Sequence, residues 1–417
     1  MAVLLTNISS IITCAVGNST NKSGIEMQDI GEIRNGALLF DKEILWVGNS
    51  ADATDYLMKN NPAPITQVID CKGKTVLPGF VDSHTHIVFA GSRAGEFARR
   101  LQGVSYQQIA AEGGGILRTM NAVRTASQTD IEAIGRKLAL SALKQGTTTI
   151  EVKSGYGLTF ESELKLLRAI RTLQQELQLR VIPTFLGAHD FPPEFRTNRT
   201  KYIDIICNEM IPAVVEENLA VFCDVFTDTG YFTVPESEKI LQTAIDAGLK
   251  VKVHADELSS FGAAEMAARM NAISADHLLF ISEAGINLMR ESGTIATLLP
   301  GTAYTLKLPF APAQTMIEHG LAVALATDCN PGSCFMENMQ MVLSLACTMG
   351  GMTVEEAISA STINGAAALG LSNQTGSLEI GKSADFIIAD CADYAELVYH
   401  FGTNQVREVW IQGKKVV

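Results

Sequence analysis

The sequence contains only seven histidines, and five of them end short apolar runs in the middle of the chain. His84 and His86 form a His-x-His pair after the run LPGFV, whereas His189, His254 and His277 end three later runs. Residues two apart in a β-strand point to the same side, so both imidazoles of the pair can reach one ion. Five of seven histidines at strand ends therefore predict a functional site rather than scattered surface or core positions.

Asp328 ends the last of these runs, LAVALATD, and completes a set of residue types that bind metals. Imidazole nitrogens suit zinc and iron, and a carboxylate adds negative charge. We therefore predict one ion bound by His84, His86, His254 and Asp328. Some barrel hydrolases bridge two metals through a lysine on the fourth strand, but the fourth run, AVFCDVFTD, has none. Lys153, in EVKSGYG, is open to two interpretations, a structural ion pair or a functional group.

Glu257 lies three residues after His254, in the segment HADE. A carboxylate beside a metal can act as general base and then as general acid, and we predict this role for Glu257. It would otherwise be a helix N-terminal residue favoured by the helix dipole. Asp256 is the alternative base, although alternation along the strand would point it elsewhere. Three roles are open for His277: a fifth metal ligand, a proton carrier, or a group that polarises a carbonyl. Asp328 is an alternative proton acceptor to Glu257.

These side chains need rigid elements that end at a common face. Eight short β-branched runs within residues 77–371 alternate with helical patterns such as DIEAIGRKLALSALKQG. The alternation indicates an α/β fold with a parallel sheet, and eight repeats over roughly 290 residues predict a (β/α)₈ barrel of the TIM type. Residues 1–76 and 372–417 contain short apolar runs separated by turn residues, and we expect both ends to form one small β-sandwich domain.

The composition limits the classes of function. The 417 residues are 47% hydrophobic and 18% charged, which is typical of a globular protein. A net charge of -13 disfavours nucleic-acid and anionic-membrane surfaces, but a small acidic substrate needs only local basic groups. The first residues, MAVLLTNISSIITCAVG, lack a basic segment, so we expect no export signal. The eight cysteines are scattered and form no CxxC motif, which predicts reduced thiols and a cytoplasmic protein. A homodimer is expected only because it is the commonest closed assembly.

Several segments spread over nearly the full length carry a family resemblance: FVDSHTHIVFAGSR, EGGGI, EVKSGYGL, GAHD, VKVHADE, SADHL, LLPG and ATDCNPGS. Together they resemble the amidohydrolase superfamily of metal-dependent hydrolases and, within it, the imidazolonepropionase family. The resemblance implies an enzyme of histidine degradation that opens the cyclic amide of 4-imidazolone-5-propanoate to give N-formimidoyl-L-glutamate. It also implies one divalent or trivalent ion per subunit, zinc or iron, that activates a water molecule for attack.

The resemblance assigns roles residue by residue. The metal ligands would be the four residues already named, and Glu257 and His277 would be the acid/base pair. Arg93, in AGSR, would meet the propanoate, since its planar fork can bind a carboxylate through two N–H groups. The remaining substrate contacts would be Tyr106, Tyr156, His189, Glu257, Asn330, Gly332 and Ser333.

Two other functions fit parts of the pattern. Related barrels that deaminate nucleobase-like rings use similar histidines and a similar aspartate, but they need no clamp for a carboxylate, which Arg93 would provide. Other relatives have lost their metal ligands and act as assembly proteins. All four predicted ligands are present here, which disfavours that interpretation.

Overall fold

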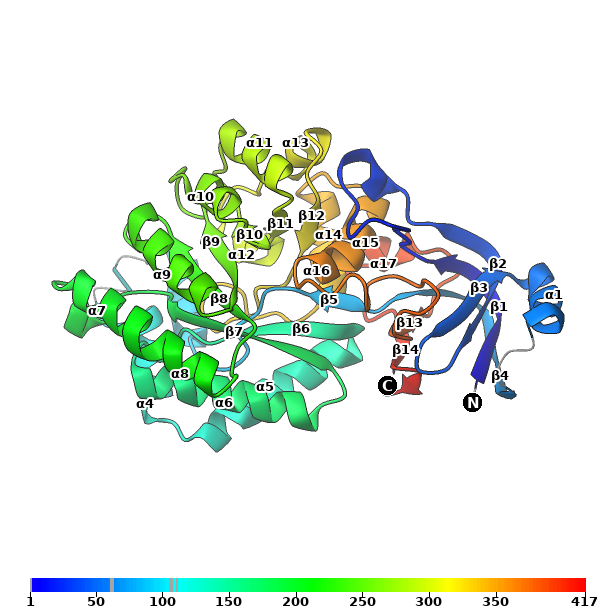
Figure 1. Cartoon of the computed structure of the whole chain (residues 1–417), viewed down its shortest axis with the longest axis horizontal. Coiled ribbons are helices and arrows are strands. Elements are labelled where there is room, and N and C mark those ends of the chain that lie inside the picture. The colour runs from blue at the N-terminus through cyan, green and yellow to red at the C-terminus, as the bar shows by residue number, and fades with distance from the viewer. Residues whose placement is uncertain (1, 61–63, 105–107, 110–111) are drawn as a thin grey trace.

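The computed structural model describes every residue except 1, 61–63, 105–107 and 110–111. Its strands form two sheets, an eight-stranded parallel sheet and a seven-stranded mixed sheet. Figure 1 shows the barrel, with its helices, on the left and the second sheet on the right, where both chain termini lie. The chain passes from one sheet to the other between Pro78 and Phe80.

The barrel strands follow one another in chain order around the sheet. Each of the eight predicted runs contains one strand, so the predicted barrel is confirmed. The residues of most of these strands are buried throughout, as expected for parallel strands covered by helices. The strands are β5 (Phe80–Asp82), β6 (Thr147–Lys153), β7 (Arg180–Ala188), β8 (Phe222–Thr227), β9 (Lys250–Ala255), β10 (Ser274–His277), β11 (Ile295–Leu298) and β12 (Val323–Leu325).

Backbone hydrogen bonds just beyond β5 and β12 close the ring. The amide of Asp328 donates to the carbonyl oxygen of His84 at 2.9 Å, and the amide of His86 donates to that of Cys329 at 2.9 Å. Thr85 and Cys329 are the bridge partners between these two segments. The seam of the barrel is therefore built by the backbone of three predicted metal ligands.

Helices cover the outside of the barrel. Several begin with a side chain that caps free amides, such as Ser127 before α5, which accepts from the amide of Asp130. No described helix is long and apolar enough to cross a membrane. The described helices are α1 (Ser50–Asn60), α2 (Ala94–Leu101), α4 (Ile116–Thr125), α5 (Gln128–Lys144), α6 (Phe160–Glu176), α7 (Arg199–Ile205), α8 (Ile211–Glu216), α9 (Val234–Asp246), α10 (Ala263–Arg269), α11 (Glu283–Ser292), α12 (Pro300–Leu306), α13 (Ala313–Glu318), α14 (Met339–Thr348), α15 (Val354–Ser361), α16 (Ile363–Ala367) and α17 (Glu396–Tyr399), with the short turns η1 (Gly24–Gln28), η2 (Pro193–Phe195) and η3 (Ile206–Met210).

The second sheet takes strands from both ends of the chain. Its order is β15-β14-β13-β4-β1-β2-β3, with β1 and β4 parallel and the other neighbours antiparallel. Phe40 packs edge-on against Phe386, with ring centroids 5.0 Å apart, and also against Trp410. One core therefore joins the two ends. The strands are β1 (Ala2–Ile12), β2 (Glu32–Phe40), β3 (Ile44–Asn49), β4 (Ile65–Pro78), β13 (Phe386–Ala389), β14 (Val406–Ile411) and β15 (Lys414–Lys415).

A glycine in the C-terminal hairpin tests how tightly the two ends pack. Gly413 has φ +68°, and a Cβ there would collide with the backbone oxygen of Asp41. Gly381 has φ +86° with nothing within 4 Å of the same position. We expect Gly413→Ala to lose roughly 1–3 kcal/mol more unfolding free energy than the matched control Gly381→Ala. Denaturant titration of both variants measures the difference, and equal losses would contradict close packing at Asp41.

Candidate active site

A cavity of about 620 Å³ opens at the carboxyl ends of the barrel strands. It collects nearly all of the residues predicted to act in binding or catalysis, although they are scattered along the sequence. His84 lies below its wall, fully buried, and Tyr106 falls outside the described residues. The predicted residues that line it are His86, Arg93, Tyr156, His189, His254, Glu257, His277, Asp328, Asn330, Gly332 and Ser333.

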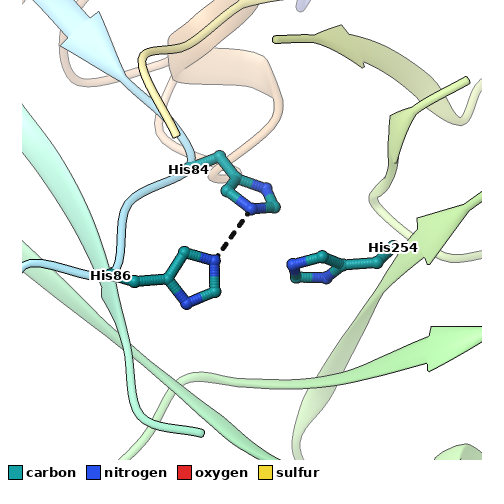
Figure 2. Close-up of side chains that lie close together, drawn as sticks. All are labelled: His84, His86 and His254. Carbon is teal, nitrogen blue, oxygen red and sulfur yellow. Dashed lines mark hydrogen bonds between the residues drawn. The ribbon is translucent and has the colours of Figure 1, made fainter. Parts of the chain in front are cut away.

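The side chains of three histidines converge on one point, as Figure 2 shows. His84 and His86 follow β5, and their Nε2 atoms lie 3.2 Å apart. Together with His254 at the end of β9, each offers one nitrogen within 4.8 Å of the others. Asp328 Oδ1 lies 3.6 Å from Nε2 of His84 and 3.5 Å from Nε2 of His86. The other Asp328 oxygen accepts from Thr302 at 2.5 Å, which orients the carboxylate.

The chemistry of this donor set fits a transition-metal ion. Burial lowers the pKa of His84 and of His86 well below the usual value, and the charge of Lys153 adds to the effect at His84. Neutral imidazoles present lone pairs, which metals require. Within the described part of the chain, the buried Nε2 atom of His254 has no hydrogen-bond partner. Three imidazoles and one carboxylate around a common point match the ligands preferred by zinc or iron.

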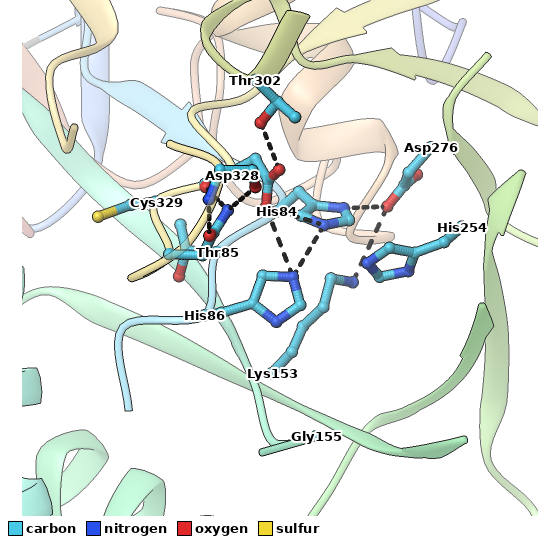
Figure 3. A network of polar contacts seen from close by, with 12 residues as sticks. His84, Thr85, His86, Lys153, Gly155, His254, Asp276, Thr302, Asp328 and Cys329 are labelled. Carbon is cyan, nitrogen blue, oxygen red and sulfur yellow. Dashed lines mark hydrogen bonds and ion pairs between the residues drawn. The ribbon is translucent and has the colours of Figure 1, made fainter. Parts of the chain in front are cut away.

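Carboxylates lie behind two of the histidine rings, and Figure 3 shows the contact of Asp276 with His84. Asp276 Oδ2 lies 2.6 Å from Nδ1 of His84, and Asp224 Oδ2 lies 2.9 Å from Nδ1 of His254. The hydrogen bond at Nδ1 of His84 leaves its Nε2 as the metal-binding atom, and the Asp224 carboxylate lies in close contact with Nδ1 of His254. Sequence reasoning missed both aspartates. The signal for Asp224 was a charged residue within the largely apolar strand β8, whereas β10 is Ser-Ala-Asp-His and offers no such contrast for Asp276.

Two fully buried lysines sit deeper in the barrel. Lys153 Nζ lies 2.8 Å from Asp224 and 2.9 Å from Glu151, and Lys252 Nζ lies 3.1 Å from Glu151 and 3.6 Å from Asp276. Burial alone would lower the pKa of Lys153, but Asp224 and Glu151 outweigh it and raise that pKa above its usual value. The inner carboxylates are thus bound by ammonium groups. This arrangement fits one metal and gives Lys153 the structural ion pair considered from the sequence.

Glu257 and His277 face each other at the side of the cavity. Glu257 Oε2 lies 3.6 Å from Nδ1 of His277. Burial raises the pKa of Glu257 to about 8, and the charges of Asp328 and Asp228 add to the rise. Asp228 also accepts from the amide of Leu258 at 2.7 Å, which anchors the loop that carries Glu257. A carboxyl group with this pKa can exchange a proton near neutral pH.

Asp256, the alternative base, is turned away from the cavity. Its carboxylate accepts hydrogen bonds from the amides of Phe261, Ala263 and Ala264, at 2.8, 3.2 and 3.0 Å. These contacts stabilise the start of α10. The expectation that strand alternation points Asp256 elsewhere agrees with this geometry.

The remaining predicted residues surround the mouth. His189 stacks on His86 with ring centroids 5.2 Å apart, and its Nδ1 lies 3.0 Å from the carbonyl oxygen of Gly155. Asn330 accepts from the amides of Gly332 and Ser333, both at 2.8 Å, and so shapes the loop after β12. In the described structure, the side chain of Asn330 therefore stabilises the backbone of this loop.

Comparison with solved structures shows which fold this is. A crystal structure of a triazine hydrolase variant covers 100% of this chain, with a TM-score of 0.76 and 16% identity; 94% of that chain is covered. An adenosine deaminase from Xanthomonas campestris with bound zinc gives a TM-score of 0.71 at 18% identity, covering 99% of this chain and 92% of the other. At such identities the likeness concerns the fold alone.

Comparison with curated sequences is more specific. The profile of the amidohydrolase family matches residues 75–416. An imidazolonepropionase of Porphyromonas gingivalis is 46% identical over 420 residues, which cover 100% of this chain and 97% of the relative. An imidazolonepropionase of Alkaliphilus oremlandii is 45% identical over 418 residues, covering 100% and 98%. The chain therefore belongs to the amidohydrolase family and, within it, to the imidazolonepropionases.

Proposed function

We propose that this protein hydrolyses 4-imidazolone-5-propanoate to N-formimidoyl-L-glutamate. The observation that carries the proposal is the content of one cavity. His86, His254 and Asp328, which with His84 would hold the metal, line it together with the buried carboxyl group of Glu257 and the guanidinium of Arg93. The metal group and Glu257 suit attack of water on a cyclic amide, and Arg93 suits a substrate that bears a carboxylate.

His84, His86, His254 and Asp328 would hold one zinc or iron ion. When bound, such an ion supplies Lewis acidity, which polarises a carbonyl and lowers the pKa of water. The three imidazoles and the one buried carboxylate would bind such an ion without any further charged ligand. Asp276 and Asp224 would keep the Nε2 atoms of His84 and His254 directed at it.

Glu257 would move the proton. Its carboxylate takes a proton from the attacking water as the oxygen bonds to the ring carbonyl carbon. It then returns this proton to the ring nitrogen as the carbon–nitrogen bond breaks, so one group serves as base and then as acid. His277, 3.6 Å from Glu257, would donate a hydrogen bond to the carbonyl oxygen as negative charge develops there.

Arg93 would bind the propanoate at the other side of the cavity. With Tyr156, His189 and the loop of Asn330, Gly332 and Ser333, it would orient the ring over the metal group. A nucleobase deaminase would not use this arginine for binding. The full-length identity to imidazolonepropionases, rather than the fold shared with an adenosine deaminase, supports ring opening.

The test of this function is an absorbance assay for loss of 4-imidazolone-5-propanoate, run beside metal analysis of the same sample. We expect ring opening that is lost with a chelator and restored by zinc or iron. Release of ammonia from nucleobases by a protein that is inert on the imidazolone would instead support the deaminase.

Replacement of Glu257 tests the proton transfer. We expect Glu257→Gln to lower kcat by about 10²–10⁴-fold, because the amide cannot accept the proton, while metal content is retained. Steady-state kinetics with metal analysis measures both. Glu283→Gln, an exposed glutamate at the start of α11, is the matched control. Wild-type kcat in Glu257→Gln would assign the proton to another group.

Replacement of Asp276 tests the support of His84. We expect Asp276→Asn to weaken metal binding by about 10–100-fold, because the ring loses its anionic partner at Nδ1. Competition with a coloured chelator measures the affinity, and thermal melting shows whether the variant is folded. Asp246→Asn, exposed on α9, should bind metal as the wild type does. A folded Asp276→Asn with unchanged affinity would contradict the role.

A further inference from the structure

Arg93 forms an ion pair with a residue that the predicted site did not include, Glu96. We propose that Glu96 is a positioning residue that fixes the guanidinium of Arg93 against Gly332, so that the cavity selects substrates bearing a carboxylate. This inference rests on the proposed function, because it assumes that Arg93 meets the carboxylate of the substrate. The inference adds to that function the contacts that hold the arginine side chain in position.

Glu96 forms a buried ion pair with Arg93 within the first turn of α2. Arg93 Nε donates to Glu96 Oε2 at 2.9 Å, and the side chains are only 9% and 6% exposed. A charge-assisted hydrogen bond in such surroundings is among the stronger polar contacts. Because Nε lies in the plane of the guanidinium, this contact fixes the orientation of the fork.

The segment EGGGI fixes Glu96 in turn. The amide of Gly115 points at both carboxylate oxygens of Glu96, at 3.3 and 3.2 Å. Gly115 has φ +69° and ψ -148°, a conformation that is accessible to glycine and to few other residues. A Cβ on Gly114 would lie 3.1 Å from Glu96 Oε1 and 2.6 Å from Ile109 Cγ2. The glycines of this segment therefore let the backbone approach the carboxylate.

Gly332 supports the guanidinium from the loop after β12. A Cβ at this position would overlap Nη1 of Arg93 and lie 2.6 Å from its Cζ, so the absent side chain is the space that the guanidinium occupies. Arg100 donates from Nη2 to the carbonyl oxygen of Gly332 at 3.1 Å, which ties this loop to α2. Glu96 and Gly332 thus contact Arg93 from two different segments.

Fixing the arginine matters because it borders two cavities. Beside the substrate cavity lies a second one of about 430 Å³, whose lining includes Arg93 as well as Phe89, Phe335 and Met336. An arginine without its partner at Nε gains room to leave the substrate. Ordering a long side chain at the moment of binding costs affinity, and a preorganised side chain avoids that cost. We therefore expect the clamp to act on recognition of the carboxylate rather than on the bond-breaking step.

The experiment compares two substrates, 4-imidazolone-5-propanoate and its neutral side-chain amide. The readout is the ratio of their kcat/KM values in the wild type, Glu96→Ala, Arg93→Ala and the double variant. We expect Glu96→Ala to lower this ratio by about tenfold, mainly through KM, and to add little in the Arg93→Ala background. Glu96→Gln, which retains an acceptor oxygen for Nε, should recover part of the loss.

The control is a second arginine–glutamate pair, which joins α2 to the segment EGGGI. Glu112→Ala removes the exposed partner of Arg99, 2.6 Å away, and should leave the substrate ratio unchanged. If Glu96 only stabilised the fold, Glu96→Ala would slow both substrates equally and would still add its full effect to Arg93→Ala. Either result overturns the proposal. A wild type inert on both imidazolones would instead refute the proposed function.

Discussion

The fold and the site both depend on how charge is balanced inside the barrel. Glu151, Asp224 and Asp276 are completely buried, and removing a carboxylate from water costs several kcal/mol unless it is paired. Lys153 and Lys252 place ammonium groups within 3.1 Å of Glu151 and Asp224, and Lys252 lies 3.6 Å from Asp276. The two ammonium groups do not neutralise the three inner carboxylates, and Asp328 adds a further buried carboxylate beside the histidines. A cation held by the histidines and Asp328 would therefore meet a negatively charged interior, which favours metal binding.

The same region closes the barrel. His84, His86 and Asp328 use their side chains for the metal group and their backbones for the seam between the first and last strands. Asp328 and His277 also adopt φ values of +51° and +79°, which are strained for residues other than glycine. Closure of the ring therefore holds the backbone in a conformation that aims these side chains inward. Local propensity alone would not produce this geometry.

Much of this arrangement could be predicted from the sequence because it follows from local patterns. Each barrel strand corresponds to a β-branched run, and His-x-His on one strand face is a local signal. Asp276 behind His84, and Glu96 behind Arg93, could not be predicted in the same way. Asp276 and its partner His84 lie 192 positions apart in the sequence. Arg93 and Glu96 are close in the sequence, but their ion pair is held in place by Gly115 and Gly332, which come from later segments. Contacts between residues of different strands and loops form only when the barrel is folded, so local sequence patterns do not predict them.

The two ends of the cavity thus suit different tasks, bond cleavage at the metal group and substrate recognition at Arg93. At the metal end, neutral imidazoles and a carboxylate suit the hydrolysis of many carbon–nitrogen bonds, and the fold is shared with a triazine hydrolase and an adenosine deaminase at 16–18% identity. At the arginine end, the contacts come from the start of α2 and from the loop after β12, and loops vary more easily than strands. Bond cleavage can therefore be kept while recognition changes. If Arg93 binds the carboxylate, as proposed, recognition depends on α2 and the loop after β12, and it can change without altering the metal group.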